Sequence, residues 1–194
     1  KFMIDRGETV RLETSVLFTD RGIAEIKSDP NYATIPDWIS NTTQDGDVIN
    51  DYARAMFSSG KHYLPSNQLT PGRTDYGTNK NFTCIRYAEI ILMYAEALNE
   101  TGNTADAIDY INEVREIHGL MPALTISSQS EVKTQIIHER TMELTLESTR
   151  FFDLRRWGML DQVMQAAGRN SFNSSEHAYL PVPLIEIQSN SAID

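Results

Sequence analysis

The stretch from Arg86 to Glu100 restricts the possible folds of this chain more than any other segment. Its residues predict a helix that is apolar over most of its circumference, with a narrow polar stripe at Glu89, Glu96 and Glu100. A helix on the surface of a domain has an apolar stripe on one side only, so a helix of this kind is buried on several sides. We therefore expect a mainly α fold in which this helix packs between other helices.

A second helix is expected after a very short turn. Gly102 stands where the C-terminal cap of the first helix belongs. Ala107, Ile111 and Val114 then fall on one face of a helical segment that ends at His118. Two helices joined by so short a connection must be antiparallel neighbours.

A third helix is expected to begin at Ser128 or Ser130. Ser128 and Glu131 have the spacing of a capping box, in which each side chain binds a backbone N–H near the other residue. The pattern after them predicts one helix that continues to about Leu154.

A stripe of charged residues runs along this third helix. Glu139, Glu143, Glu147 and Arg150 follow one another at spacings of four, four and three. Carboxylates four residues apart repel one another by a few tenths of a kcal/mol on an exposed helix, and no lysine is interleaved with them. We expect arginines from elsewhere to pair with the stripe in a semi-buried network; a solvated charged face is the alternative. The candidate partners are Arg86, Arg115, Arg155 and Arg156.

The first 83 residues differ in composition from the rest of the chain, because they hold most of the turn-forming residues. Alternation from Val10 to Phe18 predicts a half-buried strand, and residues 51–57 are read as one short helix. The remainder reads as long loops, which are uncommon in compact domains unless they bind something. We therefore divide the chain into a loop-rich, strand-containing ligand-binding region, 1–83, and a helical region, 84–194. We expect the two regions to form one structural domain that is a fragment of a larger protein.

Composition excludes several classes of function. The net charge of −10 over 194 residues argues against a nucleic-acid partner, since no basic stripe can neutralise phosphates. Cys84 is the only cysteine, so no internal disulfide can form. No apolar run reaches the roughly 20 residues that a membrane-spanning helix needs.

No catalytic, cofactor or metal signal stands out in the sequence. Glu143 and Glu147 lie on one helix stripe and cannot flank a sugar bond from opposite sides, as a glycosidase requires. The histidines have no zinc-site spacing. Asp29, Asp45, Asp47 and Asp51 could supply calcium ligands, but they lack the spacing of a calcium loop. We expect no enzyme activity, no cofactor and no metal.

Aromatic residues occur throughout the polar loops between residues 31 and 76. Exposed aromatic rings stack on the apolar faces of sugars, and neighbouring amides and carboxylates bind hydroxyl groups. Asp37 and Asn41 flank Trp38 in this way. The alternative is that these rings only pack the loops onto the helices. The candidate ligand-binding residues are Trp38, Tyr32, Tyr52, Tyr63, Tyr76, Asp37 and Asn41.

The string Arg86-Tyr87-Ala88-Glu89 continues into Leu92-Met93-Tyr94-Ala95-Glu96-Ala97. With further ordered motifs along nearly the whole chain, it resembles the SusD/RagB family. One departure from the family pattern is Ser148, which stands where glycine is common. We expect the charged residues of these motifs to form a structural polar network. Its predicted members are Arg86, Glu89, Glu139, Arg140, Glu143, Arg150, Asp153 and Arg156.

The resemblance implies a tetratricopeptide-like helical scaffold whose loops build a ligand site. SusD-like proteins are lipid-anchored at the bacterial cell surface, where they cap a SusC-like TonB-dependent outer-membrane transporter and capture glycans or, in some cases, peptides. This chain is then expected to be the C-terminal part of such a protein, without the N-terminal lipid anchor. The competing hypothesis is a helical-repeat scaffold that contacts protein partners and binds no ligand itself.

Overall fold

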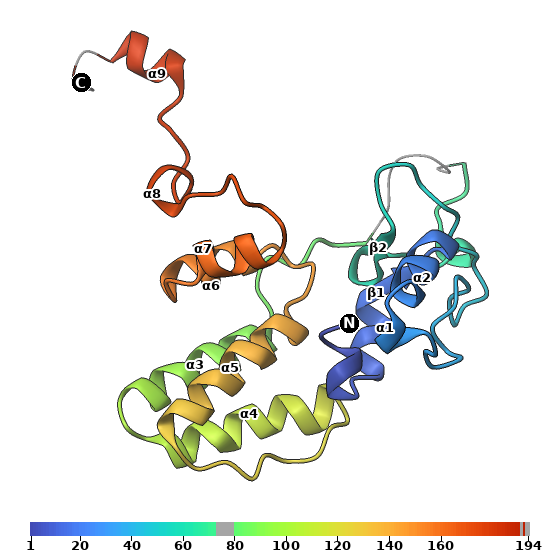
Figure 1. The fold of residues 1–194 in the computed structure, drawn as a ribbon, viewed down its shortest axis with the longest axis horizontal. Helices are drawn as coiled ribbons and strands as arrows, with labels where there is room; N and C mark the ends of the chain where they lie inside the picture. Colours follow the sequence, from blue (N-terminus) through green and yellow to red (C-terminus); the bar gives the residue numbers. More distant parts are fainter. Residues whose placement is uncertain (73–79, 191, 193–194) are drawn as a thin grey trace. The chain divides into compact units, whose positions relative to one another are not determined.

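The computed structural model describes residues 1–72, 80–190 and 192. These residues form two compact units, Lys1–Glu147 and Ser148–Asp194. The described part of the chain is mainly helical, and its one sheet has two short strands (Figure 1). The expected fold class, mainly α with a little β near the N-terminus, is confirmed.

The first unit contains the two strands and the three longest helices. Its elements are η1 (Ile4–Arg6), α1 (Val10–Ser15), β1 (Val16–Phe18), α2 (Asp20–Lys27), η2 (Pro30–Tyr32), β2 (Phe57–Ser59), η3 (Gly60–His62), η4 (Ser66–Gln68), α3 (Tyr87–Glu100), α4 (Thr104–His118) and α5 (Gln129–Glu143), where η marks a 3-10 helix. The second unit contains α6 (Arg150–Arg156), α7 (Leu160–Ala166), α8 (Ser174–His177) and α9 (Leu184–Ser189).

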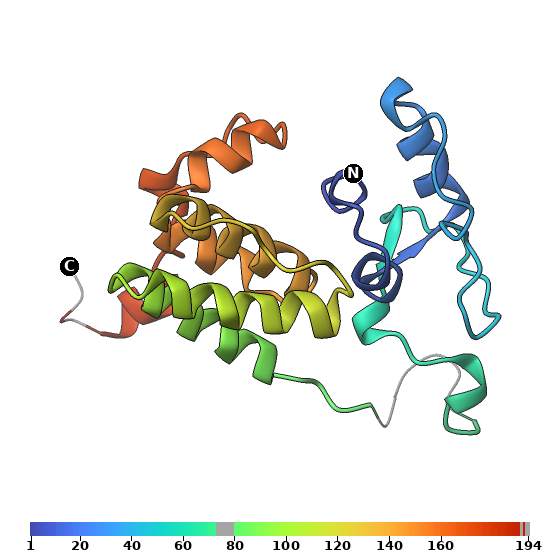
Figure 2. The ribbon, with the colours of Figure 1, turned by 90° about the horizontal axis from the view of Figure 1, so that it is seen from below.

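Helices α3, α4 and α5 lie side by side in both views of the ribbon (Figures 1 and 2). The turn after α3 satisfies the last carbonyls of that helix: Gly102 has a φ of 87°, and the Asn103 N–H binds the Leu98 carbonyl at 2.9 Å. The predicted capping box of Ser128 and Glu131 begins α5. A shared core fills the space between the three helices. Its buried members are Ala95, Ala107, Ile111, Val132 and Ile136.

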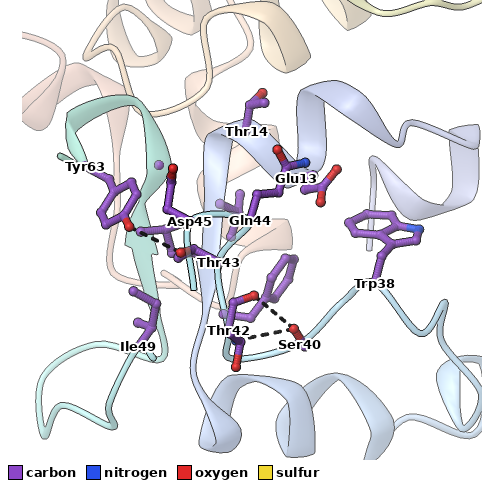
Figure 3. Close-up of a pocket in the computed structure, with 14 residues that line it drawn as sticks. Glu13, Thr14, Trp38, Ser40, Thr42, Thr43, Gln44, Asp45, Ile49 and Tyr63 are labelled. Carbon is purple, nitrogen blue, oxygen red and sulfur yellow. Dashed lines mark hydrogen bonds between the residues drawn. The ribbon is translucent and has the colours of Figure 1, made fainter. Parts of the chain in front are cut away.

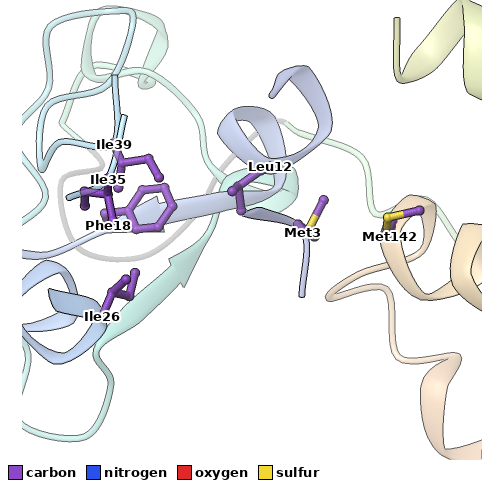
Figure 4. Close-up of a cluster of buried hydrophobic side chains, with 7 residues drawn as sticks. All are labelled: Met3, Leu12, Phe18, Ile26, Ile35, Ile39 and Met142. Atoms are coloured by element: carbon purple, nitrogen blue, oxygen red, sulfur yellow. The ribbon is translucent and has the colours of Figure 1, made fainter. Parts of the chain in front are cut away.

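A second core lies under the N-terminal elements (Figure 4). Strand β1 pairs antiparallel with β2, with Val16 opposite Ser59 and Phe18 opposite Phe57. The buried side chain of Phe18 packs there, and Met142 of α5 belongs to the same cluster. The full cluster is Met3, Leu12, Phe18, Ile26, Ile35, Ile39 and Met142.

The predicted strand over Val10 to Phe18 is wrong for most of its length, because residues 10–15 form α1 and only Val16–Phe18 is extended. The helical turn buries Arg11, Leu12 and Ser15, and it brings the Arg11 guanidinium onto Glu8, three residues earlier. Burial of this ion pair overrides the weak strand preference of the alternating apolar residues.

The predicted helix at residues 51–57 is also wrong. This segment turns back on itself through a bridge between Tyr52 and Ala55 and then enters β2. The Arg21 guanidinium on α2 donates hydrogen bonds to the carbonyls of Tyr52 and Ala55, at 2.8 and 3.0 Å. The backbone N–H of Arg21 donates to the Asp51 carboxylate at 3.0 Å. The contact with α2 therefore replaces the hydrogen bonds of a local helix.

The single helix predicted from Ser128 to about Leu154 is wrong as well, because α5 ends at Glu143 and α6 begins only at Arg150. Leu146 and Ser148 between them have φ angles of 64° and 67°, in the left-handed region that breaks a right-handed helix. Ser148 is the position where the family pattern favours glycine, and the left-handed backbone gives the physical reason for that preference.

The second unit has a small core of its own, formed by Leu154, Leu160 and Ala178. Within it the Arg156 Nε donates to the Asp153 carboxylate at 2.9 Å, and the Arg155 guanidinium lies 4.7 Å from the centre of the Tyr179 ring. No helix in the described parts of either unit combines the length and the apolar character that crossing a membrane requires.

Candidate functional site

A cavity of about 220 Å³ lies beside β1 in the first unit, and we call it the Trp38 cavity. Trp38 and Tyr63 lie on opposite sides of it, with the side chains of Thr43, Gln44 and Asp45 between them (Figure 3). Its lining residues are Glu13, Thr14, Val16, Leu17, Phe18, Trp38, Ser40, Thr42, Thr43, Gln44, Asp45, Ile49, Gly60 and Tyr63.

Hydrogen bonds hold Tyr63 in the wall of this cavity. Its hydroxyl donates to the Asp47 carboxylate and lies 3.2 Å from the Thr43 hydroxyl. The backbone N–H of Ser66 donates to Asp47 at 2.8 Å, and the Ser66 hydroxyl binds the same carboxylate. The bonds from Ser66 and Tyr63 hold the pKa of Asp47 below its usual range, so Asp47 stays an acceptor at neutral pH. Burial and, to a smaller extent, the hydrogen bond to Asp47 raise the pKa of Tyr63.

Trp38 is half-buried and packs its indole against the N-terminal core cluster. The lining as a whole offers aromatic faces at two ends and hydroxyl, amide and carboxyl groups between them. A set of a few polar groups among apolar walls is the usual composition of a site for a small polar molecule.

The other residues predicted to bind ligand lie around this cavity or away from it. The Asn41 amide oxygen accepts the Thr42 hydroxyl at 3.1 Å next to the lining. Tyr32 packs on the core cluster, and its hydroxyl donates to Asp5 at 2.5 Å, which raises the pKa of Tyr32 to about 12. Tyr52 is 57% exposed outside the cavity, and Asp37 is also exposed outside it. Tyr76 lies outside the described residues.

Glu13 and Thr14 are lining residues that the sequence did not single out. They come from α1, which lies more than twenty residues before Trp38 and was expected to be a strand. Only the folded chain brings α1 against the 40–45 loop, so no local pattern could have indicated these two residues.

The carboxylate stripe of α5 enters a buried ion network, which begins at Glu139. Glu139 has no exposed surface. Its carboxylate accepts hydrogen bonds from the guanidinium groups of Arg11, at 2.6 Å, and Arg115, at 2.5 Å. Arg11 also donates to both carboxylate oxygens of Glu8, with Nε to Oε2 at 2.7 Å. Burial works to lower the pKa of Arg11, but the bonds to Glu8 and Glu139 outweigh it and raise the pKa.

The same network continues past the end of α5, which is Glu143, to Glu147. Arg86 donates from Nη1 to Glu143 at 2.6 Å and from Nε to Glu147 at 2.7 Å, and Lys61 also binds Glu147. The Nδ1 atom of His118 lies 3.0 Å from the Glu143 carboxylate. Burial works to raise the pKa of Glu143, but the bonds from His118 and Arg86 outweigh it and hold that pKa below its usual value. The buried ion network comprises Glu8, Arg11, Lys61, Arg86, Arg115, His118, Glu139, Glu143 and Glu147.

The structure places the members of the predicted polar network in both units. Arg86, Glu139 and Glu143 belong to the buried ion network, and Arg140 lies 3.9 Å from Glu89. Arg150, Asp153 and Arg156 belong to the second unit. The sequence reasoning missed Glu8, Arg11, Lys61 and His118. The first three lie in the region whose loops were read as ligand-binding, far from the stripe in the sequence.

Among the described residues, no three His, Cys, Asp or Glu side chains gather in an arrangement that could hold a metal ion. Of the four aspartates considered for calcium, Asp29 pairs with Lys1 at 2.7 Å, and Asp47 and Asp51 are engaged as described above.

The chain is similar to known proteins of one family. The model of the SusD family matches residues 5–194. SusD-like protein P2 of Formosa agariphila is 34% identical over 131 residues, which is 62% of this chain and 26% of that protein. SusD-like protein P25 of the same organism is 33% identical over 167 residues, 74% of this chain and 31% of that protein. The chain thus spans roughly a quarter to a third of these relatives. A SusD superfamily structure from Bacteroides vulgatus has 36% identity and a TM-score of 0.43, covering 44% of this chain and 18% of that one.

Proposed function

Because this chain belongs to the SusD family, we propose that it is a binding component of a cell-surface glycan-uptake system and that the Trp38 cavity receives the sugar. The observation that carries this proposal is the cavity itself. It sets the Trp38 and Tyr63 rings on opposite sides of a polar lining. A sugar presents apolar C–H faces and a rim of hydroxyl groups, and the cavity offers a partner to each of them.

The polar residues of the cavity suit hydroxyl groups, which both donate and accept hydrogen bonds. Asp45 and Glu13 accept, Gln44 does both, and Thr42 and Thr43 add hydroxyls. Asp47 acts through Tyr63, because its carboxylate fixes the phenol ring in the wall. A ring that is already held in place loses little conformational freedom when the ligand binds.

The proposal extends to the partner and to the location of the whole protein. We infer that the complete protein works at the outer membrane, through a lipid anchor, beside a SusC-like TonB-dependent transporter to which it passes the oligosaccharide. Family membership is the support for this part, and a peptide is the other nutrient class that membership allows.

We propose binding without catalysis. A glycosidase needs one carboxylic acid with a raised pKa to protonate the leaving group. The candidate pair from the sequence, Glu143 and Glu147, has the opposite property. Burial works to raise each pKa, but the bonds from His118 and Arg86 to Glu143, and from Arg86 and Lys61 to Glu147, lower both. Neither group suits a general acid at neutral pH. Release of reducing sugar from a polysaccharide by the pure chain would overturn this point.

Affinity electrophoresis tests the proposal. The chain is run through native gels that contain starch, mixed-linkage β-glucan, xylan, galactomannan or alginate. We expect at least one of them to retard the wild type, and Trp38→Ala and Gln44→Ala to reduce that retardation. Tyr52→Ala is the matched control, since Tyr52 is an exposed aromatic outside the cavity. Circular dichroism establishes that each variant is folded.

The alternative, a scaffold that only contacts proteins, has one observation in its favour. Helix α3 exposes a row of apolar side chains, among them Tyr87, Ile90 and Tyr94. On that reading the Trp38 and Gln44 variants migrate like the wild type in every gel. That result would remove the glycan proposal for the Trp38 cavity.

A further inference from the structure

A second and larger cavity lies next to η3 in the first unit, and we call it the Phe82 cavity. It has a volume of about 540 Å³. Gly60 and Tyr63 face the Trp38 cavity, whereas Lys61 and His62 line the Phe82 cavity. Thr14 lines both. The residues around the Phe82 cavity are Thr14, Lys61, His62, Lys80, Asn81, Phe82, Thr83, Arg86, Glu143 and Glu147.

The Phe82 ring forms an open platform in this cavity. The side chain is 67% exposed, although a phenylalanine gains free energy from burial. Its ring stacks on the His62 imidazole with the centres 5.7 Å apart and the planes 17° from parallel. The His62 Nδ1 atom lies 2.7 Å from the Ser59 hydroxyl, and this hydrogen bond orients the imidazole beneath the phenyl ring. The other face of Phe82 is thus a supported apolar surface.

The charged groups that line the same cavity already satisfy one another. Arg86 and Lys61 form ion pairs with Glu147, and Arg86 forms another with Glu143. The Lys80 ammonium donates to the Tyr63 carbonyl at 2.7 Å. A second anion brought here would meet Glu143 and Glu147, whereas a hydroxyl group can donate to a carboxylate and accept from a cation at the same time. Paired charges of this kind therefore favour a neutral ligand rich in hydroxyl groups.

We propose that the Phe82 cavity is a second binding site, and that it takes a neutral sugar unit stacked on Phe82 with its hydroxyls directed to the Arg86, Glu143 and Glu147 cluster. This site goes beyond the proposed function, because it rests on its own cavity and aromatic ring. It shares only Thr14 with the Trp38 cavity.

The test compares Phe82→Ala with two matched variants. Phe82→Tyr keeps the ring. Tyr87→Ala removes an aromatic side chain that is 72% exposed and lies only five positions away, but lines neither cavity. Each variant is titrated by affinity electrophoresis through graded amounts of the polysaccharides named above. On a neutral polysaccharide that retards the wild type, we expect Phe82→Ala to bind on the order of tenfold more weakly, as the loss of a central aromatic contact does. Phe82→Tyr and Tyr87→Ala should bind like the wild type.

The double variant Trp38→Ala with Phe82→Ala separates the two proposals. Two independent sites predict that each single variant keeps part of the retardation and that the double variant loses it. If Phe82→Ala is retarded like the wild type and Trp38→Ala alone abolishes the retardation, the Phe82 site is refuted and the proposed function stands. If Phe82→Ala alone reduces the retardation and Trp38→Ala is retarded like the wild type, the Trp38 site is refuted instead. A loss confined to alginate would overturn the assignment to neutral sugars, and no retardation of the wild type in any gel would refute both sites.

Discussion

Replacing Arg11 by methionine should destabilise the first unit severely, and the structure gives the size of the effect. Arg11 is almost fully buried, and it is the only residue in the described network that binds both Glu8 and Glu139. Both carboxylates are themselves buried, so the change leaves Glu8 without its guanidinium partner and Glu139 with one guanidinium in place of two. Removing one partner of a buried ion pair costs about 3–5 kcal/mol, against a typical total of about 5–15 kcal/mol for a domain.

Urea unfolding followed by circular dichroism measures this loss. With a slope of about 1–3 kcal/mol per molar urea, a change of 3 kcal/mol or more moves the midpoint by at least about 1 M. The control is Lys133→Met, which breaks a pair with Glu100 that is about half exposed on both sides. An exposed pair of that kind contributes about 0–1 kcal/mol.

A double variant decides whether the cost comes from the carboxylate that is left without a partner. Glu8→Met combined with Arg11→Met removes both charges of one pair. Replacing both partners of a buried ion pair by apolar residues lowers the free energy of unfolding much less than removing one partner does. We expect the double variant to be more stable than Arg11→Met alone, with a coupling energy of at least about 1 kcal/mol. If Arg11→Met shifts the midpoint no more than Lys133→Met does, the network carries no such energy and the reasoning fails.

Three further changes probe other parts of the first unit and the segment after it. Ser148→Gly should raise the free energy of unfolding by up to about 1 kcal/mol in the same urea assay, since glycine relieves the left-handed backbone at φ 67° but enlarges the unfolded ensemble; a loss of stability would contradict this. Glu143 has a lowered pKa, so its contribution is complete above its ordinary value of 4.5 and disappears as the pH falls through the lower folded value; Glu143→Gln should flatten the fall of stability in acid, and an unchanged pH profile would count against it. Gly60→Ala should destabilise the chain and disturb both cavities, because an added Cβ would lie 2.2 Å from the Thr14 carbonyl oxygen; a wild-type melting temperature would show that η3 moves freely.

The helical region could be predicted from the sequence because its signals are local. The apolar circumference of α3, the glycine after it and the Ser128 capping box each depend on residues within a few positions of one another. The break after Glu143 was missed because left-handed residues such as Leu146 carry no sequence signal when they are not glycine.

The N-terminal region could not be predicted in the same way, because long-range contacts decide its structure. Arg11 of α1 binds Glu139, 128 residues away, as well as Glu8, and the turn at residues 51–57 is held by Arg21 on α2. The candidate site shows the same division. Trp38 and Tyr63 could be named from their aromatic, polar surroundings, but Glu13 and Phe82 join their cavities only through the fold.

Helix α1 links the buried ion network to both cavities. Arg11 points into the network, while Glu13 and Thr14, two and three residues further on, line the Trp38 cavity, and Thr14 also lines the Phe82 cavity. At the far end of the network, Lys61, Arg86, Glu143 and Glu147 are themselves cavity residues. The carboxylates that the sequence presents as a structural stripe therefore have two roles: Glu139 holds α1 through Arg11, and Glu143 and Glu147 line the same cavity as Phe82. A network with every charge paired can do both, because it is rigid enough to position the walls and still presents donors and acceptors to a hydroxyl-rich ligand.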